Sequence, residues 1–106
     1  MTTAAMPAGL AAYKRTPTFD QDTLPAGLRR EHRTKAGVWA LIHVVEGSLR
    51  YRILDPPSEE ILTVGTPGLV RPEQAHEVAP IGQMRMYVEF YSDRTVQGGP
   101  HTSQVL

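Results

Sequence analysis

The chain has 106 residues, of which 41% are hydrophobic and 21% are charged, and this composition is typical of one globular domain rather than of a disordered or collagen-like chain. Lysine plus arginine equal aspartate plus glutamate at 11 each, and the one basic cluster spans residues 29–35, so we expect no nucleic acid and no membrane as a partner. The lack of cysteine excludes disulfides, thiolate metal sites and thiol nucleophiles.

The sequence also gives no sign of a membrane segment or a secretory signal. Its longest apolar run, residues 38–45, is far shorter than the roughly 18 residues that span a bilayer. The N-terminus lacks the basic start and the sustained apolar run of a signal peptide. We therefore expect a cytoplasmic protein.

The predicted elements are mainly strands, because nine glycines and nine prolines interrupt the chain too often for long helices. The one helix candidate is the alanine-rich segment 8–13, which follows Pro7. Segments rich in β-branched and aromatic residues then predict strands at 38–45, 48–54, 60–64, 68–71 and 84–91. Two of them alternate apolar with polar or tyrosine positions, with the apolar series Leu49, Tyr51, Ile53 and Met84, Met86, Val88, Phe90.

Turn residues separate these strands. Glu46-Gly47 predicts a tight hairpin between the first two, because glycine readily takes the positive φ that such a turn needs. Residues 55–58 and 65–68 predict two further turns, and Pro72 ends the fourth strand because proline cannot donate to a sheet.

Many short strands with a turn about every 8 to 12 residues predict an all-β sandwich or barrel in a single domain. We expect a flexible N-terminal segment at residues 1–12, the domain at 13–93 and a C-terminal tail at 94–106.

Four histidines are the natural metal ligands of a chain without cysteine. His101 lies in the predicted tail and is interpreted as solvated. His43 alternates with Leu41 and Val45, which favours a packed, hydrogen-bonded position in the sheet. His32 and His76 lie at strand or loop edges, where residues distant in the sequence assemble a site.

A third ligand is expected from another strand, and Glu89 is the candidate because it interrupts an aromatic run with a carboxylate that is costly to bury alone. Two imidazoles and one carboxylate are the ligand set of Fe(II) sites, and with a water they also suit Zn(II). The alternatives are a surface position for His32, a loop hydrogen bond for His76 and a solvent-facing Glu89 beside Arg85. No nucleotide-binding, nucleophile-elbow or HExxH motif is present.

Four blocks of sequence carry a resemblance to a known family: HRTKAGVW at 32–39, VVEGSLRY at 44–51, VRPEQAHEV at 70–78 and EFY at 89–91. Over about residues 13–92, the chain resembles the TehB/YeaR-like family of small cupins, which occur alone or as the N-terminal domain of the tellurite-resistance protein TehB. The resemblance implies a cupin double-stranded β-helix, or jelly roll, a homodimer and a divalent metal in the mouth of the barrel.

In that resemblance His32 matches the histidine of the first block and His76 that of the second motif, and Glu89 falls where some relatives have an acidic residue. The chain lacks the HxH pair of the usual first cupin motif, and Ala40 stands where that motif has glutamate. Because TehB carries its methyltransferase in a further domain, methyl transfer is not expected of these 106 residues.

The leading hypothesis is a metal-binding cupin that takes one divalent cation at His32, His76 and Glu89 and binds a small molecule or an oxyanion, in tellurite or another stress response. Zinc is the favoured metal, with iron, nickel or manganese as alternatives. A non-haem metal-dependent dioxygenase and a metal-free structural or interaction module are the competing hypotheses. Three further residues are expected to contact an anionic ligand: Arg71, Arg85 and Tyr87.

Overall fold

Two long antiparallel strands, β3 (Trp39–Leu54) and β6 (His76–Ser92), form the centre of the fold in the computed structural model, which describes residues 6–92. They belong to a six-stranded sheet in the order β1-β6-β3-β4, in which β2 also pairs with β6 and β5 with β3. The other elements are β1 (Ala11–Arg15), β2 (Phe19–Asp20), the 3-10 helix η1 (Ala26–Arg29), β4 (Pro57–Thr63) and β5 (Gly68–Val70).

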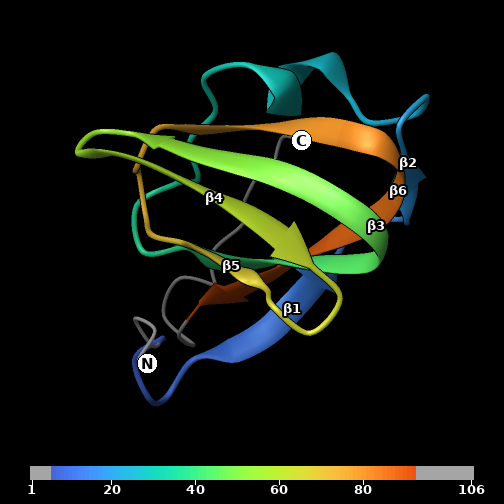
Figure 1. The fold of residues 1–106 in the computed structure, drawn as a ribbon. Coiled ribbons are helices and arrows are strands. Elements are labelled where there is room, and N and C mark those ends of the chain that lie inside the picture. Colours follow the sequence, from blue (N-terminus) through green and yellow to red (C-terminus); the bar gives the residue numbers. More distant parts are fainter. Residues whose placement is uncertain (1–5, 93–106) are drawn as a thin grey trace.

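Both long strands bend together, so that their halves lie in two layers (Figure 1). The first half of β3 pairs with β5 on one side and with the second half of β6 on the other. Its second half pairs with β4 and with the first half of β6. The β3–β6 pair therefore contributes to both layers of the domain, and the remaining strands extend each layer.

Glycine at position 47 makes the bend, where the sequence predicted a hairpin. Gly47 has φ +77 and lies inside β3, between two shifts of the β3–β6 register at Val44/Glu46 and Gly47/Ser48. A Cβ at this position would collide with the carbonyl oxygen of Gln83 on β6. The hairpin prediction was wrong because a positive φ serves a bulge as well as a turn.

The hydrophobic core lies between the two layers and follows the predicted alternation. Even-numbered residues of β6 point inward, and β3 changes parity across its bend, from Ala40, Ile42 and Val44 to Leu49 and Tyr51. The prediction of an all-β, single-domain fold is confirmed. The largest fully buried side chains include Tyr51, Phe90, Leu49, Leu62, Met84 and Met86.

The predicted turns at 55–58 and 65–68 are confirmed, because they join β3 to β4 and β4 to β5, and β5 ends at Val70, just before Arg71-Pro72. The helix expected at 8–13 is wrong: β1 begins at Ala11 and pairs with the end of β6, so tertiary pairing overrides the helix propensity of alanine. The first part of β6, residues 76–83, was not predicted as a strand, because Pro80, Gly82 and the polar residues around them are uncommon in strands. The predicted tail at 94–106, with His101, lies outside the described residues.

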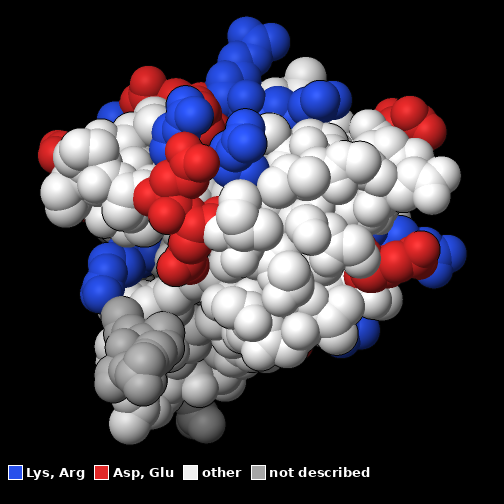
Figure 2. Space-filling model, viewed as in Figure 1, with Lys and Arg blue, Asp and Glu red and all other residues white. Residues whose placement is uncertain are grey.

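Charges of both signs are intermixed on the surface seen in Figure 2. Across the outer side of β3, β4 and β6, Arg52 lies 3.4 Å from Glu59 and 3.0 Å from Glu77, and Arg50 lies 3.3 Å from Glu59. Exposed pairs of this kind each contribute about 0 to 1 kcal/mol to stability. Within residues 6–92, no helix combines the length and apolarity needed to cross a membrane.

We predict that Gly47→Ala lowers the free energy of unfolding by about 2 kcal/mol or more, because it adds a steric collision to the strain of a positive φ. Gly65→Ala is the matched control: Gly65 has φ +88 but open space around a Cβ, so only about 1 kcal/mol should be lost. Urea unfolding measures both values, and equal losses would contradict the role assigned to the close approach at Gly47.

Candidate functional site

Two histidines that are distant in the sequence meet beside the first residues of β6. His32, which follows η1, forms an isolated β-bridge with His76 at the start of β6. Each backbone N–H donates to the carbonyl of the other residue, with N···O distances of 2.8 Å from His32 and 3.0 Å from His76. The imidazole rings lie edge to face, with centroids 5.3 Å apart. The predicted meeting of these two side chains is therefore observed.

The ring of His76 is held in one orientation by the loop that precedes it. Its Nδ1 lies 3.0 Å from the carbonyl oxygen of Gln74. Because a carbonyl oxygen only accepts, Nδ1 carries the proton and Nε2 keeps its lone pair. His76 is buried, with 4% of its surface exposed, so the neutral form is oriented within the protein interior.

Thr34 holds the loop of residues 71–74 in place. Its buried hydroxyl donates to the carbonyl of Val38 at 2.8 Å and accepts from the N–H of Glu73 at 3.3 Å. Glu73 has φ +61, a left-handed conformation that residues other than glycine rarely adopt. This conformation is stabilised by two hydrogen bonds, one from the Glu73 N–H to Thr34 and one from Arg33 to the Glu73 carbonyl. The loop thereby presents the Gln74 carbonyl to His76.

The two histidines border a small cavity between the layers. Its polar lining consists of His32, Thr34 and His76. The enclosed space is about 10 Å³, close to what one water molecule occupies, so a bulky ligand does not fit inside it. Apolar side chains line the rest, among them Leu28, Ile42, Val70, Val78, Met86 and Phe90.

Tyr51 packs beside this cavity from the second half of β3. Its ring centroid lies 6.0 Å from that of His76, and its hydroxyl donates to the carbonyl of Leu69 at 2.6 Å. Burial raises the pKa of Tyr51 above its ordinary value, so the phenol stays protonated and neutral. The hydrogen bond joins β3 to β5 and fixes the ring against His76.

Burial lowers the pKa of both histidines, and for His76 the neighbouring His32 adds to the effect while the Gln74 hydrogen bond opposes it. Both rings are therefore neutral at pH 7, which is the form that binds metals. The Nε2 of His32 is buried without a hydrogen-bond partner among the described residues. A buried ring nitrogen without a partner is costly; a water molecule would satisfy it in either tautomer, and a cation would satisfy it in the tautomer with the proton on Nδ1.

Glu89 does not join the two histidines. It lies on the outer face of the sheet, where its Oε1 is 3.1 Å from Nε2 of His43 and accepts from the Tyr91 hydroxyl at 2.9 Å. The physical reason is strand parity, since the even positions of β6 point inward and position 89 is odd. The part of the chain that the structure describes holds no cluster of three or more His, Cys, Asp or Glu side chains suited to a metal ion.

His43 occupies the packed sheet position that its alternation predicted. Besides its contact with Glu89, it stacks on Tyr87, with ring centroids 4.8 Å apart. The three expected ligand contacts have other side-chain partners. Arg71 lies over the ring of Trp39 at 5.8 Å, Arg85 pairs with Glu46 at 3.7 Å, and Tyr87 lies under Arg15 at 4.3 Å.

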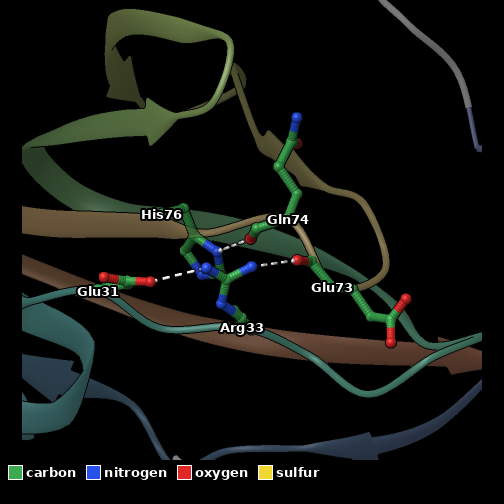
Figure 3. Close-up of polar contacts among 5 residues, drawn as sticks. All are labelled: Glu31, Arg33, Glu73, Gln74 and His76. Carbon is green, nitrogen blue, oxygen red and sulfur yellow. Dashed lines mark hydrogen bonds and ion pairs between the residues drawn. The ribbon is translucent and has the colours of Figure 1, made fainter.

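One residue that was not predicted as part of the site contacts the loop that orients His76. Arg33 donates from Nη1 to the carbonyl of Glu73 at 3.0 Å and from Nη2 to Oε2 of Glu31 at 2.7 Å (Figure 3). The available signal was its position directly after His32 in the sequence.

Comparisons with known proteins agree with the resemblance read from the sequence. The TehB-like domain matches residues 14–88. The chain is 36% identical over 42 residues to "Probable S-adenosyl-L-methionine-dependent methyltransferase TehB" of Haemophilus influenzae; this match covers 40% of the chain and 15% of that relative. The chain thus spans only a small part of the relative it matches.

Two solved structures share the fold. A protein from Escherichia coli strain K12 superposes with a TM-score of 0.80 at 20% identity, covering 86% of this chain and 98% of that one. The crystal structure of TehB from Haemophilus influenzae superposes with a TM-score of 0.75 at 28% identity, covering 83% of this chain and 33% of that one.

We predict that the stability of the metal-free protein falls on acidification from pH 7 to pH 5.5. Both histidines have folded-state pKa values below the ordinary value of 6.5, so below that pH the unfolded chain binds more protons than the folded one. Their contribution is fully present above pH 6.5 and is lost as the pH falls toward the folded pKa. Denaturant unfolding at several pH values measures this slope.

His76→Gln should flatten the slope, whereas His43→Gln, on the outer face, serves as the control. The prediction fails if the wild-type protein and the His76→Gln variant lose the same free energy over this pH range.

Proposed function

The chain belongs to the TehB-like domain family, and we propose that it is a cupin-type jelly roll that binds one divalent cation at His32 and His76. The observation that carries the proposal is the buried, unpartnered Nε2 of His32 beside the oriented imidazole of His76. The two-layered antiparallel sheet and the likeness to TehB support the jelly roll.

The donor set fits a cation of borderline character. Two neutral imidazole nitrogens suit Zn(II) best, and Fe(II), Ni(II) and Mn(II) are the alternatives. Because the structure groups no third protein ligand with the pair within residues 6–92, water or ligand oxygens would fill the remaining positions. The cation would supply Lewis acidity at the cavity, while His32 and His76 hold it and Gln74 fixes the ring of His76.

We propose a small molecule or an oxyanion as the ligand, in tellurite or another stress response and without methyl transfer by this domain. Support comes from the family match, and the size of the cavity means that such a ligand would lie at its mouth, with only the cation inside. A space of about 10 Å³ is far below the roughly 300 Å³ of pockets that bury drug-sized ligands and nucleosides. A small ion is the occupant that this volume suits.

A metal-free structural module is the second candidate, favoured by the small, mainly apolar cavity and by the two-member ligand set. The dioxygenase alternative is less well supported, because Glu89 lies on the outer face and residues 6–92 contain no set of two histidines and one carboxylate.

We predict that the wild-type protein, purified without a histidine tag, retains close to one equivalent of Zn(II), and that His76→Gln retains less than about a tenth of that. His43→Gln is the matched control, since it alters a histidine on the opposite face of the same sheet and should leave occupancy unchanged. Elemental analysis after incubation with each of the four metals measures occupancy. Equal losses in the two variants would refute the ligand assignment, and no binding by the wild type would establish the metal-free candidate.

We also propose that the chain acts as a homodimer, with a second copy on the outer face of β3 and β5. Leu41 and Leu69 are paired neighbours there and only half-buried, and the nearby Val45 is 46% exposed. Burying these side chains against a second copy would remove apolar surface from water, which favours association.

We predict that Leu41→Glu converts a wild-type dimer into a monomer. Ile61→Glu on β4, where Ile61 is 45% exposed, is the control and should leave the dimer intact. Sedimentation equilibrium gives the mass of each protein, and a dimer that survives Leu41→Glu would place the interface elsewhere.

A further inference from the structure

Arg33 contacts the loop that orients the His76 ring. Its guanidinium is anchored to the carbonyl of Glu73, and the His76 ring is anchored to the carbonyl of the next residue, Gln74. Since consecutive Cα atoms lie about 3.8 Å apart, the two side chains are anchored to neighbouring peptide groups of one loop. Figure 3 shows the Arg33 guanidinium between the Glu31 carboxylate and the Glu73 carbonyl.

Arg33 keeps unused donors in this position. A guanidinium has five N–H groups in a planar fork, and the hydrogen bonds to Glu31 and Glu73 occupy two of them. The Arg33 side chain is 55% exposed, so the remaining donors are accessible to a ligand from solvent. A fixed, exposed fork of this kind matches carboxylates and oxyanions.

The carboxylate of Glu31 already shows which chemistry this fork accepts. Its Oε2 lies 2.7 Å from Nη2 of Arg33, a short charge-assisted hydrogen bond. The Glu31 side chain is 58% exposed, and such an exposed pair contributes only about 0 to 1 kcal/mol, so an external anion can replace it.

The two arginines that the sequence predicted to contact an anion have other side-chain partners. Arg71 lies over Trp39, and Arg85 pairs with Glu46 on the outer face. Arg33 differs from both because its guanidinium donates to a carboxylate and also to the Glu73 carbonyl, in the loop of residues 71–74 that orients His76.

We propose that Arg33 is the binding residue for a small anion, either a carboxylate or an inorganic oxyanion, at the mouth of the histidine cavity. Glu31 acts as an internal competitor that occupies the guanidinium until the anion replaces it. This inference rests on the proposed function in one respect, since it makes the anion a neighbour of the proposed cation at His32 and His76.

The experiment titrates the metal-free protein with sodium sulfate and, separately, with sodium acetate at constant ionic strength. The side-chain Nε–H resonances of the arginines are followed by ¹⁵N NMR. The resonance of Arg33 should shift and saturate, whereas that of Arg85 should not. A larger response to sulfate identifies an oxyanion site, and a larger response to acetate identifies a carboxylate site.

Three variants test the roles of the two residues by calorimetry. Glu31→Gln should tighten sulfate binding about two- to fivefold, because it removes the competitor. Arg33→Gln should weaken it about tenfold or more, and Arg33→Lys, which keeps the charge without the fork, should fall between. Glu46→Gln is the matched control, because the Glu46–Arg85 pair is 62% and 58% exposed and lies on the outer face.

Unchanged sulfate and acetate binding in Arg33→Gln, or no tightening in Glu31→Gln, would overturn the proposal. A Zn(II) titration without sulfate tests the histidine pair by itself. If zinc binds but the Arg33 resonance responds to neither sulfate nor acetate, only the anion subsite is rejected. If the Arg33 resonance responds to an anion but zinc does not bind, only the proposed metal function is rejected.

Discussion

The shared bend of β3 and β6 is the constraint on which the rest of the structure depends. A straight ribbon of these lengths would bury one face of one sheet, but the bent ribbon folds its own inner face into a core. Gly47 permits the bend because it combines a positive φ with the close approach of the Gln83 carbonyl. The bulge also changes the parity of β3, so that Ala40 and Ile42 before it and Leu49 and Tyr51 after it all point inward.

Parity also decides which polar side chains meet. His76 and Glu89 belong to the same strand, but they lie thirteen positions apart and therefore on opposite faces of β6. His76 enters the cavity, where burial keeps it neutral. Glu89 remains outside and meets His43 and Tyr91. The sheet thus builds two separate histidine environments, one buried and without a carboxylate, the other half-exposed and paired with one.

Much of this arrangement could be predicted from the sequence. The alternation at 84–90 correctly identified the inward face, and applied strictly it also places Glu89 outside. The competing expectation, that a carboxylate within an aromatic run needs a cation, overlooked His43 and the Tyr91 hydroxyl as partners. The pairing of His32 with His76 was predicted from their positions at strand or loop edges and then from the family resemblance, because no local pattern connects residues 44 positions apart. The sequence predicted two strands where the structure has the single strand β3, because a glycine with positive φ fits both a hairpin and a bulge.

The size of the cavity and the position of Arg33 together narrow the kind of ligand that the proposed site suits. A space of about 10 Å³ accepts an ion or a water molecule and nothing larger. Any further atoms of a ligand must then lie outside the cavity, and the loop that orients His76 also anchors the exposed guanidinium of Arg33. Neutral imidazoles add no charge inside, so a cation there would leave a net positive field at the mouth, strengthened by Arg33. Electrostatics therefore favour a small anion over a neutral ligand of the same size, and Glu31 supplies that negative charge while no anion is bound.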